Sequence, residues 1–152
     1  MLNKTLPSFS RLIYGKYYFP IRVYYEDTDA GGVVYYANYL KFAERARTEM
    51  LRLFGCQQQD MKEKLDCGFV VRRCNADYHK PARLDDVLEI ETEIIAVGGA
   101  SVEMCQRIIK GNETLVVMDI KLACMSFSGS ATRVPESIRT RMHELISSNG
   151  ED

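Results

Sequence analysis

Three carboxylates stand within four positions of the stretch YEDTDAGGVVYYANYL, at Glu26, Asp27 and Asp29. The glycines Gly31 and Gly32 follow, and an aromatic-rich segment with the pattern of a helix start comes after them. Amides at the N-terminus of a helix have no partner inside the helix and attract negative charge. Glycine lets the backbone approach a ligand without a Cβ in the way. The stretch therefore predicts a site where a carboxylate and free backbone amides contact the same group of a bound ligand.

Such a site is suited to the hydrolysis of an acyl group. The amides would stabilise the negative charge that develops on a carbonyl oxygen. The carboxylate would act as a general base on water or as a direct nucleophile. A structural role is the alternative, because Asp27, Thr28 and Asp29 also suit helix capping and Asx turns. Spacing alone leaves both roles open.

Other catalytic and metal-binding motifs are missing from the sequence. It has no G-x-S-x-G elbow and no phosphate-binding G-x-x-x-x-G-K loop. The two histidines, His79 and His143, have no partners at ligand spacing, so we expect no metal and no cofactor. The five cysteines are odd in number and form no C-x-x-C pair, which predicts reduced thiols and a cytoplasmic protein; they are Cys56, Cys67, Cys74, Cys105 and Cys124.

Length and composition favour a single globular domain, with 152 residues of which 46% are hydrophobic and 27% charged. The net charge of -1 argues against a dedicated nucleic-acid surface. No apolar run approaches the roughly 20 residues of a membrane span. Residues 1–18 contain Lys4, Arg11 and Lys16 but no acid, and we expect them to form a flexible tail. A short C-terminal tail is expected at 148–152.

The elements that must position the acid cluster follow from hydrophobic period and turn residues. An extended segment is expected from Phe19 to Glu26, and a helix from about Val34 to Phe54, ended by Gly55. Four strands then follow, at Gly68–Lys80, Val87–Val97, Ala100–Lys110 and Glu113–Phe127, and a helix runs from Pro135 to about Ser147. The alternation in VLEIETEII gives the sheet one dry face. The pattern predicts an α+β domain with a helix packed on an antiparallel sheet.

Two segments carry a resemblance to a known family. RVYYEDTDAGGVVYYANYLKFAERARTEMLR (Arg22–Arg52) and PARLDDVLEIETEI (Pro81–Ile94) resemble the 4-hydroxybenzoyl-CoA thioesterase family, especially its Tol-Pal system-associated, YbgC-type acyl-CoA thioesterase branch. The likeness covers roughly Phe19 to Ile146. It implies a hotdog fold over residues 19–147, in which an antiparallel sheet wraps a long central helix. It also implies hydrolysis of an acyl-CoA thioester to free acid and CoA.

The resemblance assigns roles to residues of the first motif. Asp29 matches the catalytic aspartate of the family, and Tyr25 matches a tyrosine near the site. The amide that polarises the thioester carbonyl would lie at about Tyr35 or Tyr36. We expect Gly32 and Val34 to contribute to substrate binding beside them.

One position departs from the branch, which usually has a histidine where this chain has Tyr36. Tyrosine titrates near pH 10 and so replaces a proton carrier with a hydrogen-bond donor or packing group. Glu44 is a second-choice carboxylate, because some hotdog thioesterases place their acid on the helix. For the phosphates of CoA, the basic residues Arg72 and Arg83 are the candidates.

Partners follow from the sheet edges and from the resemblance. An unpaired edge strand is open to pairing with a second copy. The resemblance implies that this pairing gives a homodimer or homotetramer with the site between subunits. A hotdog dehydratase is disfavoured by the missing histidine. The alternative of another class is a non-catalytic module that binds acyl-CoA or acyl carrier protein at the inner membrane, with envelope proteins as partners.

Overall fold

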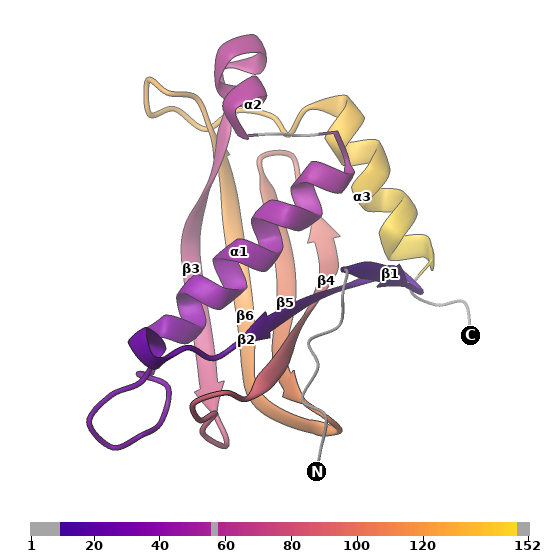
Figure 1. Cartoon of the computed structure of the whole chain (residues 1–152). Helices are drawn as coiled ribbons and strands as arrows, with labels where there is room; N and C mark the ends of the chain where they lie inside the picture. The colour runs from indigo at the N-terminus through magenta and orange to yellow at the C-terminus, as the bar shows by residue number, and fades with distance from the viewer. Residues whose placement is uncertain (1–9, 56–57, 149–152) are drawn as a thin grey trace.

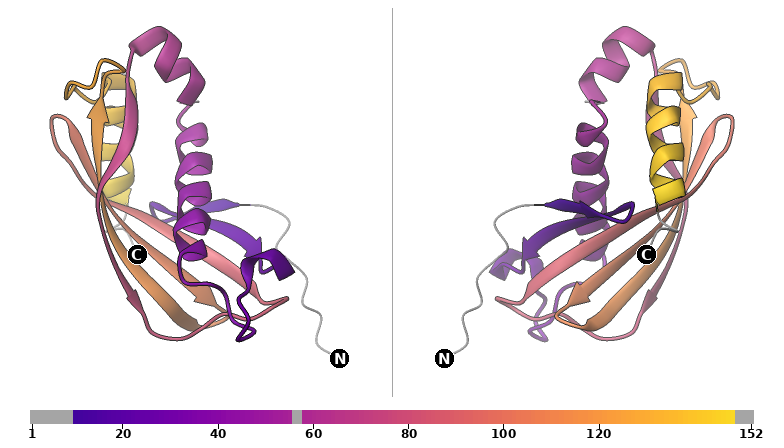
Figure 2. Two further views of the ribbon diagram at one scale, coloured as in Figure 1. Left: turned by 90° about the vertical axis from the view of Figure 1, so that its left-hand side faces the viewer. Right: turned by 90° about the vertical axis from the view of Figure 1, so that its right-hand side faces the viewer.

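The computed structural model of the chain describes residues 10–55 and 58–148. They form a curved antiparallel sheet with a long helix lying across its concave side (Figure 1, Figure 2). The sheet has six strands in the order β1-β2-β4-β5-β6-β3. These are β1 (Arg11–Ile13), β2 (Lys16–Arg22), β3 (Gly68–Tyr78), β4 (Val87–Val97), β5 (Ser101–Lys110) and β6 (Glu113–Met125). The α+β architecture and the hotdog arrangement expected from the sequence are confirmed.

The central helix α1 (Asn38–Leu53) buries one face against the sheet. Phe42, Ala46 and Met50 recur at helical spacing and are almost completely buried. Burial of a side chain as large as Phe42 or Met50 stabilises the fold by about 1.5–3 kcal/mol. The helix ends at Leu53, and Gly55, just beyond its C-cap, has a φ of +75°, a conformation that favours glycine.

Strand β4 shows why one face of the sheet is dry. Leu88, Ile90 and Ile94 are buried beneath the helix layer, while Glu89 and Glu93 lie on the opposite face. This is the alternation expected from VLEIETEII. The C-terminal helix α3 (Glu136–Ser148) packs against β4. Among the described residues, no helix has the length and apolar character that a membrane span requires.

The N-terminal part of the chain corrects one expectation. Residues 11–18, which composition placed in a flexible tail, form β1 and the start of β2. Arg11 and Lys16 form ion pairs with Glu89 and Glu93 of β4, and Tyr17 is buried. The basic residues therefore complement an acidic row that lies about 75 positions away in the sequence. Residues 1–9 and 149–152 lie outside the described residues, while Ser148 still belongs to α3.

Two further differences concern the helices and the end of β2. The extended segment expected to reach Glu26 ends at Arg22, and a single 3-10 turn, η1 (Tyr25–Asp27), follows it. A short helix that sequence reasoning did not single out, α2 (Gln58–Leu65), precedes β3. Cys56 lies outside the described residues.

Candidate active site

The acid cluster lies in the connection between β2 and α1, and its aspartates differ in role. The carboxylate of Asp27 caps the 3-10 turn, because its Oδ2 accepts the N–H of Tyr24 at 2.8 Å. The carbonyl oxygen of Asp27 accepts the amide N–H of Tyr35 at 2.9 Å and the side-chain N–H of Asn38 at 2.9 Å. Asp27 is therefore committed to holding the loop against the helix start.

Asp29 lies in a small hairpin that presents its carboxylate to solvent. Its N–H donates to the carbonyl of Val33 at 2.9 Å, and its carbonyl accepts the N–H of Gly32 at 3.0 Å. Gly32 has a φ of +79°, so the turn itself favours glycine. One carboxylate oxygen, Oδ1, accepts the N–H of Gly31 at 2.8 Å, which is the expected Asx turn. Within the described residues, Oδ2 accepts no hydrogen bond, so a ligand or water has access to it.

Helix α1 begins at Asn38, four positions later than the expected Val34. Val33 and Val34 are held by the 82–83 segment instead, because Val33 pairs with Arg83 and the N–H of Val34 donates to the carbonyl of Ala82 at 2.8 Å. The amide of Tyr35 is occupied by Asp27, as described above. In the described part of the chain, the N–H of Tyr36 has no hydrogen-bond acceptor. At the helix entrance, Tyr36 therefore has a free amide N–H and Tyr35 does not.

The PARLDD segment, residues 81–86 and here called the clasp, holds this loop in place. The carbonyl of Ala82 accepts the N–H of Val34, and the N–H of Ala82 donates to the hydroxyl of Tyr39 at 3.0 Å. Asp86 is buried, and its Oδ2 accepts the N–H of Arg83 at 2.8 Å. The clasp therefore joins the Asp29 hairpin, the first turn of α1 and the start of β4.

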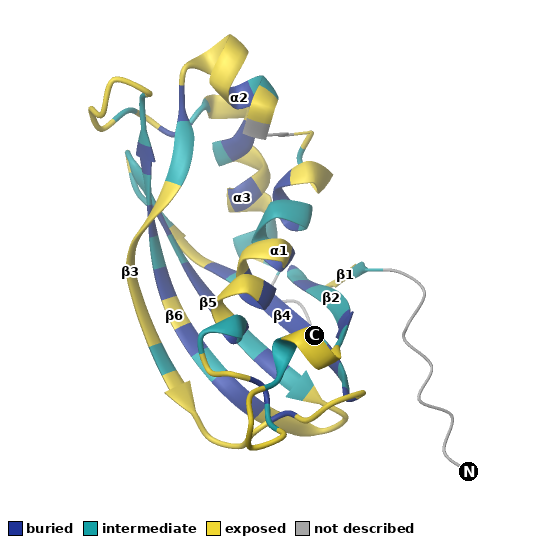
Figure 3. Ribbon diagram, turned by 60° about the vertical axis from the view of Figure 1, so that its left-hand side comes forward, coloured by how far each residue is buried: buried dark blue, intermediate teal, exposed yellow. Residues whose placement is uncertain are grey.

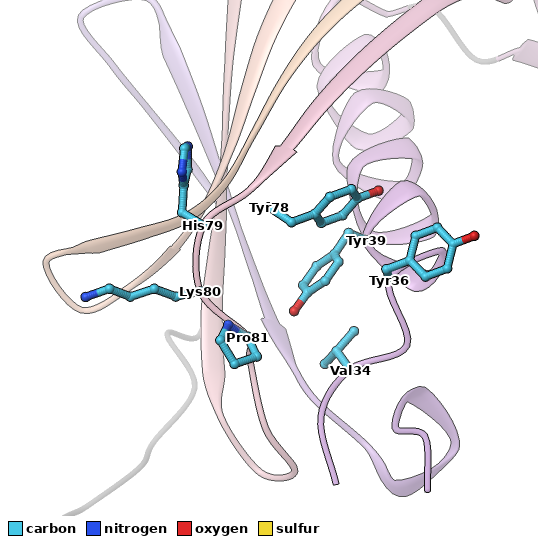
Figure 4. A pocket seen from close by; sticks show the side chains of 7 residues that line it. All are labelled: Val34, Tyr36, Tyr39, Tyr78, His79, Lys80 and Pro81. Carbon is cyan, nitrogen blue, oxygen red and sulfur yellow. The ribbon is translucent and has the colours of Figure 1, made fainter. Parts of the chain in front are cut away.

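Two pockets lie along residues 28–36. The first, here the acid pocket, has a volume of about 400 Å³ and is lined by Tyr25, Thr28, Asp29, Ala30, Gly32 and Leu84. The second, the aromatic pocket, has a volume of about 240 Å³ and is lined by Val34, Tyr36, Tyr39, Tyr78, His79, Lys80 and Pro81 (Figure 4). The structure thus brings Tyr25, Asp29 and Gly32 together in one pocket and Val34 and Tyr36 together in the other.

The aromatic pocket contains two tyrosines that sequence reasoning did not single out. The ring of Tyr78, at the end of β3, meets that of Tyr36 edge-on at a centroid distance of 6.0 Å and lies 5.8 Å from that of Tyr39. Burial raises the pKa of both Tyr39 and Tyr78, so their hydroxyls are neutral at pH 7. Tyr39 follows Tyr36 by three positions, a spacing that places two residues on the same face of a helix. This spacing could have predicted that Tyr39 lies beside Tyr36.

The expected basic residues do not gather at these pockets. Arg72 lies at an irregularity in the pairing of β3, and Arg83 is an exposed residue of the clasp; neither lines either pocket. Lys80 does line the aromatic pocket, but it forms an ion pair with Glu113. Glu44, the second-choice acid, lies exposed on α1 and accepts a hydrogen bond from Thr48 at 3.1 Å.

No metal site is evident among residues 10–55 and 58–148, where no three His, Cys, Asp or Glu side chains cluster suitably. His79 lines the aromatic pocket, but its ring points away from the tyrosines (Figure 4). The expectation that no metal or cofactor is needed stays a prediction.

Comparison with known proteins relates this arrangement to one family. The model of the Thioesterase superfamily matches residues 31–117. A curated relative from Haemophilus influenzae, named acyl-CoA thioesterase YbgC, is 44% identical over 84% of this chain and 94% of its own length. An Escherichia coli relative, named acyl-CoA thioester hydrolase YbgC, is 56% identical over 64% of this chain and 72% of its own. The crystal structure of a probable thioesterase from Bartonella henselae superimposes with a TM-score of 0.75 at 37% identity, covering 78% of this chain and 98% of that one.

Proposed function

The chain belongs to the Thioesterase superfamily as a YbgC-type thioesterase, and from this we propose that it hydrolyses acyl-CoA with Asp29 as its catalytic carboxylate. The observation that carries the proposal is the free Oδ2 of Asp29 at the acid pocket. Asp27, the other acid of the D-x-D pair, is occupied as a cap and is not available for chemistry.

In the proposed reaction, Asp29 takes a proton from water as the water oxygen attacks the thioester carbonyl, or attacks that carbon itself. The carbon–sulfur bond then breaks. In the first route the protonated Asp29 returns its proton to the departing sulfur, whereas in the direct route CoA leaves as the thiolate and takes up the proton that the later hydrolysis releases. In the direct route, water afterwards hydrolyses the acyl-aspartate anhydride. Both routes release the free acid, and both need a stabiliser for the negative carbonyl oxygen.

The N–H of Tyr36 is the proposed stabiliser of that oxygen. It lies at the entrance of α1, where the helix dipole adds to its attraction for negative charge. The neighbouring amides of Val34 and Tyr35 are already bonded to protein carbonyls. The side chain of Tyr36 has no role as a base in this scheme, and Tyr25 lines the acid pocket beside Asp29.

The site is proposed to be completed by a second copy of the chain, in a homodimer or a larger assembly. Strand β3 is an edge strand of 11 residues, and residues 70–75 of it are exposed on both faces (Figure 3). Val70 and Val71 are 46% and 50% exposed there. A long edge strand leaves backbone N–H and C=O groups unpaired, and pairing with another strand satisfies them.

The test is the loss of thioester absorbance across short-chain, long-chain and aromatic acyl-CoAs for the native protein and Asp29→Asn. We expect turnover by the native protein and a loss of about 10² to 10⁴ in kcat/KM for Asp29→Asn. Glu26→Gln is the matched control, because Glu26 is a neighbouring exposed acid outside the acid pocket. It should retain native activity.

Native turnover by Asp29→Asn would assign the carboxylate to loop structure alone. Tight binding of acyl-CoA without hydrolysis, unaffected by Asp29→Asn, would favour the non-catalytic binding module. Cytoplasmic location stays a prediction from the cysteine pattern. Carrier-protein substrates and association with Tol-Pal envelope proteins stay predictions from the family resemblance.

A further inference from the structure

Tyr78 forms one wall of the aromatic pocket. The proposed chemistry gives this residue no role. Its ring contacts those of Tyr36 and Tyr39, so side chains from β3, the helix entrance and α1 meet at one place (Figure 4). Edge-on and tilted ring pairs of this kind are favourable beyond the area they bury. The wall is therefore a packed feature and not an incidental contact.

Resting on the proposed thioesterase function, we propose that Tyr78 determines acyl specificity by limiting the size of the acyl group that the aromatic pocket accepts. Tyr36, whose N–H is proposed to hold the carbonyl oxygen, also lines this pocket. An acyl group whose carbonyl lies at that amide has the apolar lining of Val34, Pro81 and the tyrosine rings beside it.

The dimensions of the pocket favour a compact acyl group. Its volume of about 240 Å³ is below the roughly 300–1,000 Å³ of pockets that enclose drug-sized ligands. Tyr39 is fixed, since it is 3% exposed and bonded to Ala82. Tyr78 is 45% exposed, so its ring is the part of the wall that a substitution removes without opening the core.

The experiment compares Tyr78→Val and Tyr78→Phe with the native protein, using butyryl-CoA and octanoyl-CoA. Valine removes the ring and keeps the β propensity of the strand, whereas phenylalanine keeps the ring and removes only the hydroxyl. We expect the native protein to prefer butyryl-CoA. The octanoyl-to-butyryl ratio of kcat/KM should rise about tenfold or more in Tyr78→Val, the effect of freeing space for a few methylenes, and stay native in Tyr78→Phe.

A binding measurement separates this proposal from the proposed function. Isothermal titration with CoA thioethers that carry a butyl or an octyl ketone in place of the thioester reports acyl size preference without hydrolysis. A shift toward the octyl probe in Tyr78→Val supports the size limit even if no thioester is cleaved. An unchanged ratio in the folded Tyr78→Val protein, equal native affinity for both probes, or binding of neither probe would overturn it.

Discussion

Tyr39 shows how one hydroxyl positions the candidate site. It is 3% exposed, and its oxygen accepts the N–H of Ala82, which is itself fully buried. The carbonyl of Ala82 in turn holds Val34, two residues before the proposed oxyanion donor Tyr36. A substitution at Tyr39 would therefore shift the site through the hydrogen bonds of the clasp, without any contact between Tyr39 and the substrate.

We expect Tyr39→Phe to lower the free energy of unfolding by about 1–3 kcal/mol, because the buried N–H of Ala82 loses its acceptor. Urea unfolding followed by circular dichroism measures the change. Tyr25→Phe is the matched control, since Tyr25 is 83% exposed and its loss of a hydroxyl should leave stability native. Equal stabilities for the native protein and Tyr39→Phe would show that the bond to Ala82 contributes nothing net.

At the scale of elements, a polar ladder joins three strands on the outer face of the sheet. The hydroxyl of Tyr18 on β2 donates to Glu91 of β4 at 2.9 Å, and Arg107 of β5 donates to the same carboxylate at 2.7 Å. Burial, reinforced by the hydrogen bond to Glu91, raises the pKa of Tyr18 to about 12. The ladder therefore depends on a neutral tyrosine.

This dependence predicts a loss of stability in alkali. Between about pH 10 and about pH 12, Tyr18 releases its proton in the unfolded chain but keeps it in the folded one, so stability falls as pH rises. Urea unfolding across this range should give a shallower decline for Tyr18→Phe than for the native protein. A residual decline is expected, since burial also raises the pKa of Cys124 to about 12. Parallel declines for both proteins would contradict the assignment to Tyr18.

At the scale of the whole molecule, the two edges of the sheet differ. One edge is β1, which has 3 residues, and the other is β3, which has 11. Val70 and Val71 point to opposite faces of β3, and both are exposed. The long edge is therefore the one that a second copy is expected to cover.

We expect the native chain of 17.4 kDa to sediment as a dimer or a larger assembly, and Val71→Lys to sediment as a monomer. A lysine at the edge opposes strand pairing, because its charge would be buried in the interface. Ile13→Lys is the control, since Ile13 is 42% exposed on β1, at the opposite edge of the sheet. A native monomer, or an intact assembly of Val71→Lys, would rule out β3 as the interface. If the site is shared between copies, thioesterase activity falls with the dissociation.

The sequence by itself determined the features that depend on local pattern. Alternation marks the two faces of β4, helical spacing marks α1, and Gly55 marks its end, because each depends on the geometry of neighbouring residues. The D-x-D pair and the glycines after it pointed to the segment that carries the candidate site. They also led to the family, which the comparisons confirmed.

Tertiary structure decided the features that depend on residues far apart in the sequence. Val33 pairs with Arg83, which delays the start of α1 to Asn38, and Arg11 meets Glu89, which turns an expected tail into a strand. Tyr78 likewise meets Tyr36 across 42 positions of sequence to form the pocket wall. Periodicity and propensity describe a residue and its near neighbours, whereas these contacts exist only once the sheet has paired and the helix has packed on it.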